Sequence, residues 1–245
     1  MITFKLEKET IKQLKKYISG LIPKKEDLYL YVNEKDEVYL VSFSKNHIYI
    51  AYLLLGVSKD ISKGAKIIQG DYAALKKFVR NLDPDDDVLL EPYQYNIWVE
   101  LSQGDNVHQL HYSGNEDINI DLDFFRGLND KEFKIYKKDF KVLELYLNDY
   151  TRLSIREGRV KFEIYNRNFS IFAEHTTYDE FQNEGSATFY LANKCFRDLL
   201  KKFNADGPIR LILDKKWPLL LEAGDFTGLL APRLLVEGHD LWRLI

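Results

Sequence analysis

The residues of this chain that could do chemistry are its five histidines, one cysteine and several clustered aspartates. His108 and His111 are close in sequence, but on a strand they would point to opposite faces and make poor co-ligands for a metal ion. His47, His175 and His239 have no cysteine or histidine at the spacing of metal ligands. The histidines therefore indicate no metal site.

The aspartate clusters also lack the partners that chemistry needs. Four of residues 83–87 are aspartates, but the ordered Gly and distal Glu of an EF-hand loop are absent, which favours a solvated turn over a calcium site. Asp121 and Asp123 could form a carboxylate pair, yet no base or phosphate-binding loop accompanies them. Cys195 lies beside the apolar Phe196 and is better explained as a small core residue than as a nucleophile.

None of the common catalytic motifs is present: there is no G-x-S-x-G, no Walker A and no G-x-G-x-x-G. The sequence predicts a binding protein that has no catalytic activity and needs no cofactor or metal. The alternative from another class is a small α+β enzyme whose site is assembled from the residues set aside above.

Composition narrows the class further. Of 245 residues, 45% are hydrophobic and 30% charged, as in an ordinary well-packed soluble protein. No apolar run approaches the roughly 20 residues that span a bilayer, and the first residues do not resemble a signal peptide. One cysteine is consistent with a reducing compartment. We expect a cytoplasmic protein without a membrane partner.

Four segments have the apolar spacing i, i+3, i+4, i+7 of an amphipathic helix. They are Thr10–Ser19, Tyr72–Leu82, Lys138–Asn148 and Asn193–Phe203, the last with Asn193 as its expected N-cap. Each follows a short strand-like segment and precedes alternating, β-prone segments separated by polar turns. The strands expected are 2–7, 28–33, 37–42, 47–54, 66–70, 88–92, 96–102, 107–112, 132–136, 152–157, 160–166, 169–177, 187–192, 209–213 and 219–223.

The pattern therefore repeats four times as strand, helix and strands, although residue identity between copies is weak. Residues 113–130 interrupt it with an acidic stretch that alternates apolar and aspartate side chains. The prediction is an α+β protein with two similar domains of two units each. Its parts are a domain at 1–112, a connector at 113–130, a second domain at 131–236 and a tail at 237–245.

Positive charge is concentrated on these helices. Residues 8–20, 71–82, 137–149 and 193–203 sum to +8, so the rest of a chain of net charge −3 carries −11. Helices that share one concave surface would attract a phosphate backbone without reading bases; the alternative is that Lys and Arg simply suit solvated helix faces. The third helix is neutral through three acids, for which the sequence offers no reason. Candidate DNA-binding residues are Lys8, Lys12, Lys15, Lys16, Lys76, Lys77, Arg80, Lys137, Lys141, Lys194, Arg197, Lys201 and Lys202.

The segment CFRDLLKKF…GPIRLILDKKWPLLLEAGDFTGLLAPRL resembles the C-terminal end of DNA sliding clamps of the PCNA type. The four-copy layout with a connector resembles them over the whole chain. The resemblance implies the DNA-clamp fold, with antiparallel sheets outside and helices lining the inner face of a ring. It also implies a non-catalytic processivity factor in DNA replication and repair, a homotrimer, and loading by an ATP-dependent clamp loader.

The same resemblance implies a pocket for a short apolar peptide of DNA polymerase and other proteins with clamp-binding motifs. The segment VSFSKNHIYI aligns with the family's AMD-x-x-H-V region, although Ser44 replaces its acidic residue. The tail, ending DLWRLI, would pack on the body or occupy a docking groove. Pocket residues implied are Phe43, His47, Ile120, Leu122, Pro218, Leu229, Ala231 and Pro232.

In this family, subunits join by pairing of edge strands, which removes exposed edges. The segments that correspond here are Val107–Tyr112 and Glu174–Phe181. Two alternatives remain within the clamp class. The chain could be one subunit of a hetero-oligomeric ring, or a monomeric polymerase accessory factor that holds DNA without encircling it.

Overall fold

The computed structural model describes residues 1–45, 48–59, 66–84, 86–93, 98–112, 132–136, 150–156, 159–165, 170–178, 187–203, 207–212 and 218–231. For the strands between residues 132 and 190 the backbone alone is described. The chain divides into two compact units. The first unit contains Met1–Ile120 together with Lys202–Asn204 and Gly224–Phe226, and the second unit contains the remaining residues. The domain boundaries expected from the sequence did not include these two short returning segments and stay a prediction.

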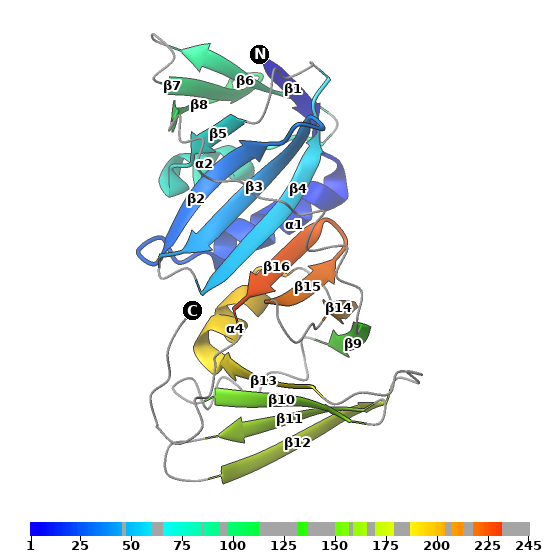
Figure 1. Cartoon of the computed structure of the whole chain (residues 1–245). Helices are drawn as coiled ribbons and strands as arrows, with labels where there is room; N and C mark the ends of the chain where they lie inside the picture. The colour runs from blue at the N-terminus through cyan, green and yellow to red at the C-terminus, as the bar shows by residue number, and fades with distance from the viewer. Residues whose placement is uncertain are drawn as a thin grey trace. The chain divides into compact units, whose positions relative to one another are not determined.

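Figure 1 shows the order of elements along the first unit, in which strand, helix and three strands occur twice. The first copy is β1 (Ile2–Lys5), α1 (Lys8–Gly20), β2 (Glu26–Val32), β3 (Glu37–Ser44) and β4 (Tyr49–Val57). The second copy is β5 (Lys66–Gln69), α2 (Tyr72–Arg80), β6 (Asp87–Tyr93), β7 (Trp98–Gln103) and β8 (Asn106–Tyr112).

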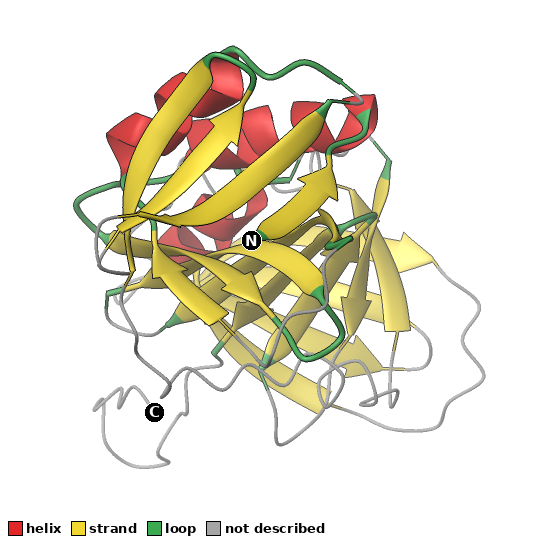
Figure 2. Ribbon diagram, turned by 90° about the horizontal axis from the view of Figure 1, so that it is seen from above, coloured by secondary structure: helices red, strands yellow, loops and turns green. Residues whose placement is uncertain are grey.

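The described elements of the other two copies follow the same order. One is β9 (Glu132–Tyr136), β10 (Tyr150–Arg156), β11 (Arg159–Tyr165) and β12 (Ser170–Tyr178). The helix expected at 138–148 lies outside the described residues. The other is β13 (Ala187–Ala192), α4 (Asn193–Leu200), β14 (Pro208–Ile212), β15 (Leu219–Ala223) and β16 (Phe226–Leu230). The predicted α+β class is confirmed, and strands dominate the described chain (Figure 2).

Hydrophobic periodicity explains the two helices of the first unit. In α1, Ile11, Leu14 and Ile18 are among the buried residues, and the helix ends at Gly20. In α2 the buried residues are Leu75, Phe78 and Val79. The side chain of Asp71 accepts a hydrogen bond from the Ala74 amide at 2.6 Å, satisfying one of the amides left without a partner at a helix N-terminus.

The strands of the first unit hydrogen-bond in the order β1-β6-β7-β8-β5-β2-β3-β4, with every pair antiparallel. Strands β1 and β4, at the two ends of this order, approach each other. The backbone amide of Lys59, just after β4, donates a hydrogen bond to the carbonyl of Thr3 in β1 at 2.7 Å. Helix α1 packs against β4, and α2 packs against α1 and β8. The helices therefore cover the sheet with their apolar sides.

A buried tyrosine fastens α1 to the sheet. The Tyr17 hydroxyl donates to the Ala51 carbonyl at 2.7 Å and lies 2.9 Å from Ser42 Oγ. Burial raises the pKa of Tyr17 well above its usual value, so the phenol keeps the proton that it donates.

In the second unit, β15, β14 and β9 pair antiparallel, and β12-β11-β10-β13 form a separate sheet with β12 at one edge. Helix α4 follows β13 directly, and its buried residues include Phe196, Leu199 and Leu200. Two details of its prediction are wrong. The N-cap is Ala192, without a side-chain cap, and Asn193 is a buried helical residue; the helix ends at Leu200 instead of Phe203.

Replacing Gly56 of β4 by alanine should destabilise the protein. The new Cβ would lie 2.9 Å from the Lys5 backbone oxygen, which a side-chain rotation cannot relieve, so we expect a loss of about 1–3 kcal/mol. The control is Gly207→Ala, where a Cβ meets nothing within 4 Å and restriction of the unfolded chain should leave stability equal or slightly higher. Urea unfolding of both variants measures the difference, and equal midpoints would contradict the close approach of β4 and β1.

Candidate nucleic-acid interface

Helices α1 and α2 present a surface of positively charged side chains on the side opposite their buried residues. Six of these side chains are exposed, and that of Lys16 is half-buried. Because the two helices pack against each other in one unit, their charges lie on neighbouring surfaces. This α1–α2 cationic face consists of Lys8, Lys12, Lys15, Lys16, Lys76, Lys77 and Arg80.

Acidic groups compensate little of this charge. The one acidic residue within the two helices is Glu9, whose carboxylate lies 2.8 Å from Lys12 Nζ with both side chains mostly exposed. Exposed pairs of this kind are weak and screened by salt. Lys76 Nζ lies over the Tyr72 ring, 5.4 Å from its centre. The face can therefore bind phosphates electrostatically.

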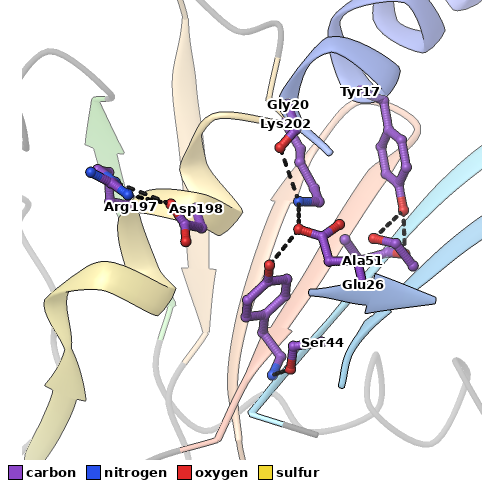
Figure 3. Close-up of polar contacts among 10 residues, drawn as sticks. Tyr17, Gly20, Glu26, Ser44, Ala51, Arg197, Asp198 and Lys202 are labelled. Atoms are coloured by element: carbon purple, nitrogen blue, oxygen red, sulfur yellow. Dashed lines mark hydrogen bonds and ion pairs between the residues drawn. The ribbon is translucent and has the colours of Figure 1, made fainter. Parts of the chain in front are cut away.

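Helix α4 is a weaker cationic element than its sequence indicates. Lys194 and Lys201 are exposed. The guanidinium of Arg197, however, donates to Asp198 Oδ1 through Nε at 3.1 Å and through Nη2 at 2.7 Å (Figure 3). These two side chains are 18% and 5% exposed, so much of the positive charge of Arg197 is neutralised before a ligand arrives.

Lys202 does not belong to the exposed face, and its assignment as a DNA-binding residue is wrong. Its Nζ lies 2.8 Å from Glu26 Oε1, and the two side chains are 0% and 1% exposed. The Tyr49 hydroxyl also donates to Glu26 Oε1, at 2.5 Å. Lys202 Nζ lies 3.4 Å from the Gly20 carbonyl oxygen (Figure 3). Lys202 is thus the counter-ion of a buried carboxylate in the first unit.

The sequence could have indicated that Glu26 is buried, but not which residue neutralises it. Glu26 alternates in β2 with Leu28, Leu30 and Val32, which are buried, so a carboxylate on that face needs a buried cation. No local pattern identifies a lysine 176 residues away. Of the other predicted DNA-binding residues, Lys137 and Lys141 lie outside the described part of the chain.

Only part of the predicted peptide pocket can be located. Phe43 is half-buried on β3, 5.8 Å from the edge-on ring of Tyr29. Ser44 Oγ accepts hydrogen bonds from the Ile48 and Tyr49 amides at 2.8 and 3.0 Å, so the residue that replaces the family's acid holds the turn between β3 and β4.

The remaining pocket residues are divided between the second unit and the undescribed segments. Pro218 and Ala231 are half-buried, and Leu229 is buried. His47, Ile120, Leu122 and Pro232 lie outside the described residues. The pocket stays a prediction.

Within the described residues, no group of three or more His, Cys, Asp or Glu side chains could hold a metal ion. In the same part of the chain, none of the helices has the length and apolar character needed to cross a membrane.

The sequence matches no protein-family model and no curated protein. Solved structures do match. The Helicobacter pylori β clamp, solved with a DNA ligase peptide, has a TM-score of 0.66 and 12% identity over 96% of this chain and 66% of its own. The same clamp in complex with 5-chloroisatin has a TM-score of 0.68 and 13% identity over 96% of this chain and 66% of its own. PCNA of A. fulgidus, bound to the C-terminal region of FEN-1, gives 0.62 and 13% over 97% of this chain and 100% of its own.

These similarities show that the chain has the fold of the DNA sliding clamps. It spans about two thirds of the length of the β clamp and matches the whole of the archaeal PCNA chain. At 12–13% identity the likeness concerns the fold, which is the fold expected from the resemblance to PCNA-type clamps.

Removing the cation of the buried pair should strongly destabilise the first unit. Lys202→Met leaves Glu26 buried without a counter-ion, and we expect a loss of about 3–5 kcal/mol. The matched control is Lys201→Met at the exposed neighbouring position, which should leave the urea midpoint unchanged. The double variant Glu26→Gln with Lys202→Met should be more stable than Lys202→Met alone, because no buried charge remains. Equal effects of the two single substitutions would contradict the pair.

Proposed function

We propose that this protein is a subunit of a ring-shaped sliding clamp that encircles duplex DNA and tethers a DNA polymerase and other DNA enzymes. The observation that carries the proposal is the α1–α2 cationic face on a chain with the clamp fold. Seven cations on two adjacent helices of an otherwise acidic protein suit a partner with a regular phosphate backbone. The clamp itself would catalyse no reaction.

The subunit would assemble as a homotrimer by pairing of edge strands. Strand β12 is an edge of its sheet, and β8 pairs with β5 through Tyr112 and His111 alone among the described residues, so the rest of that side of β8 has hydrogen-bonding groups to offer. Val107 on β8 is also 46% exposed. These features support joining β8 of one subunit to β12 of the next, which would remove both edges.

The partners proposed are proteins that carry clamp-binding peptides. The similar β clamp was solved with a DNA ligase peptide and the similar PCNA with the C-terminal region of FEN-1. We extend this mode of binding to the chain, with Phe43, Pro218 and Ala231 as accessible members of the predicted pocket. A closed ring also requires an ATP-dependent loader. The compartment would be the cytoplasm, at the nucleoid, or the nucleus in a eukaryote.

The assembled mass tests the ring. Native mass spectrometry and light scattering at micromolar concentration should give three times the 28.9 kDa of one chain. A strict monomer would contradict a self-assembling ring and favour an accessory factor. A trimer that forms only after a related subunit is added would favour a hetero-oligomeric ring.

Charge reversal tests the DNA-binding surface. The variant Lys12→Glu, Lys77→Glu, Lys201→Glu should lose stimulation of polymerase on primed circular DNA, because repulsion replaces phosphate attraction. The control Lys24→Glu, Lys25→Glu, Lys35→Glu makes the same change in net charge at exposed positions outside the helices and should retain stimulation. Equal activity of the two variants would refute the assignment of the surface.

A further inference from the structure

We propose that the duplex is held unequally within each subunit, with α1 and α2 making most of the phosphate contacts and the helices of the second half contributing few. The inference rests on the proposed function and adds to it that the two halves of the chain contribute unequally to DNA binding. The resulting ligand surface would be a set of separate cationic patches, one per subunit, in place of a uniformly charged lining.

The first half supplies cations whose charge remains available. Helix α1 has four lysines at i, i+4, i+7 and i+8 against one glutamate, and α2 has three cations at i, i+1 and i+4 with no acid inside the helix. All but Lys16 are exposed. Helix α1 packs against β4 and α2 against β8, which belong to one sheet. The backbone positions from which these seven side chains extend are therefore fixed relative to one another.

In the second half of the chain, two of the four cations of α4 and the turn that follows it form ion pairs with carboxylates of the protein itself. Residues 193–203 contain Lys194, Arg197, Lys201 and Lys202. The structure pairs Arg197 with Asp198 and buries Lys202 against Glu26. Lys194 and Lys201 are exposed, and no described carboxylate forms an ion pair with either of them. A helix counted as strongly basic in the sequence thus behaves as a weakly basic one.

The third repeat adds no net charge to compensate. Its segment 137–149 contains three lysines and three acids in the sequence, although it lies outside the described residues. Nonspecific affinity for duplex DNA depends on the number of phosphates neutralised, with a salt slope of about −0.9 for each phosphate. The available charge therefore assigns most of the binding free energy, and most of the salt dependence, to the α1–α2 cationic face.

Two variants that remove the same number of positive charges test the inference. One is Lys12→Ala with Lys77→Ala, and the other is Lys194→Ala with Lys201→Ala; all four positions are exposed. Arg197 is left unchanged because its removal would leave Asp198 without its partner. Binding of a fluorescent duplex to the full-length assembled protein is followed by anisotropy over a series of KCl concentrations, and thermal unfolding verifies that each variant is folded.

The first-half variant should weaken binding by roughly tenfold or more at low salt and reduce the magnitude of the salt slope by about 1–2 for each subunit that contacts the duplex. The second-half variant should weaken binding by less than about threefold with a nearly unchanged slope. Equal losses, or a larger loss in the second-half variant, overturn the unequal division while leaving the clamp proposal intact. A wild-type protein that neither binds the duplex nor stimulates polymerase overturns the proposed function and this inference with it.

Discussion

The buried contact between Lys202 and Glu26 is the interaction on which the first unit depends. A carboxylate on the inward side of β2 would be strongly unfavourable without a counter-ion, and the chain supplies that ion from a segment 176 residues further on. The same returning segments bring Phe203 and Phe226 into contact at 3.9 Å between ring centres, and Phe226 lies 5.6 Å from Tyr17. The core of the first unit is thus completed by residues of the second half.

Local periodicity was sufficient to predict most of the fold. The apolar faces of α1, α2 and α4 and fifteen of the sixteen described strands follow from spacings of three to four or of two residues, which each segment carries by itself. Strand β16 was not predicted, because all five of its residues are buried and its sequence does not alternate. The errors lie where tertiary contacts decide. Asn193 has the chemistry of an N-cap but is buried one residue inside the helix, and Lys202 looks like a solvated lysine until Glu26 is placed beside it.

The candidate site also has features that the sequence predicted and features that it did not. The exposure of Lys12 or Lys77 follows from its place opposite an apolar stripe, so sequence alone identified the α1–α2 cationic face. The sequence did not predict that Asp198 neutralises Arg197, because adjacent residues on a helix do not normally face each other. In the structure the Arg197 guanidinium nevertheless donates to the Asp198 carboxylate. The pocket was predicted by resemblance, and half of its residues lie outside the described structure.

The discontinuous core of the first unit has a consequence for synthesis on the ribosome. Residues 1–120 emerge first, yet Phe226 must also be made before their core is complete. At ~5–20 residues per second, the remaining hundred or so residues take roughly 5–20 s to translate. During that interval the nascent first unit lacks the counter-ion of Glu26 and the Phe203 and Phe226 rings that complete its core.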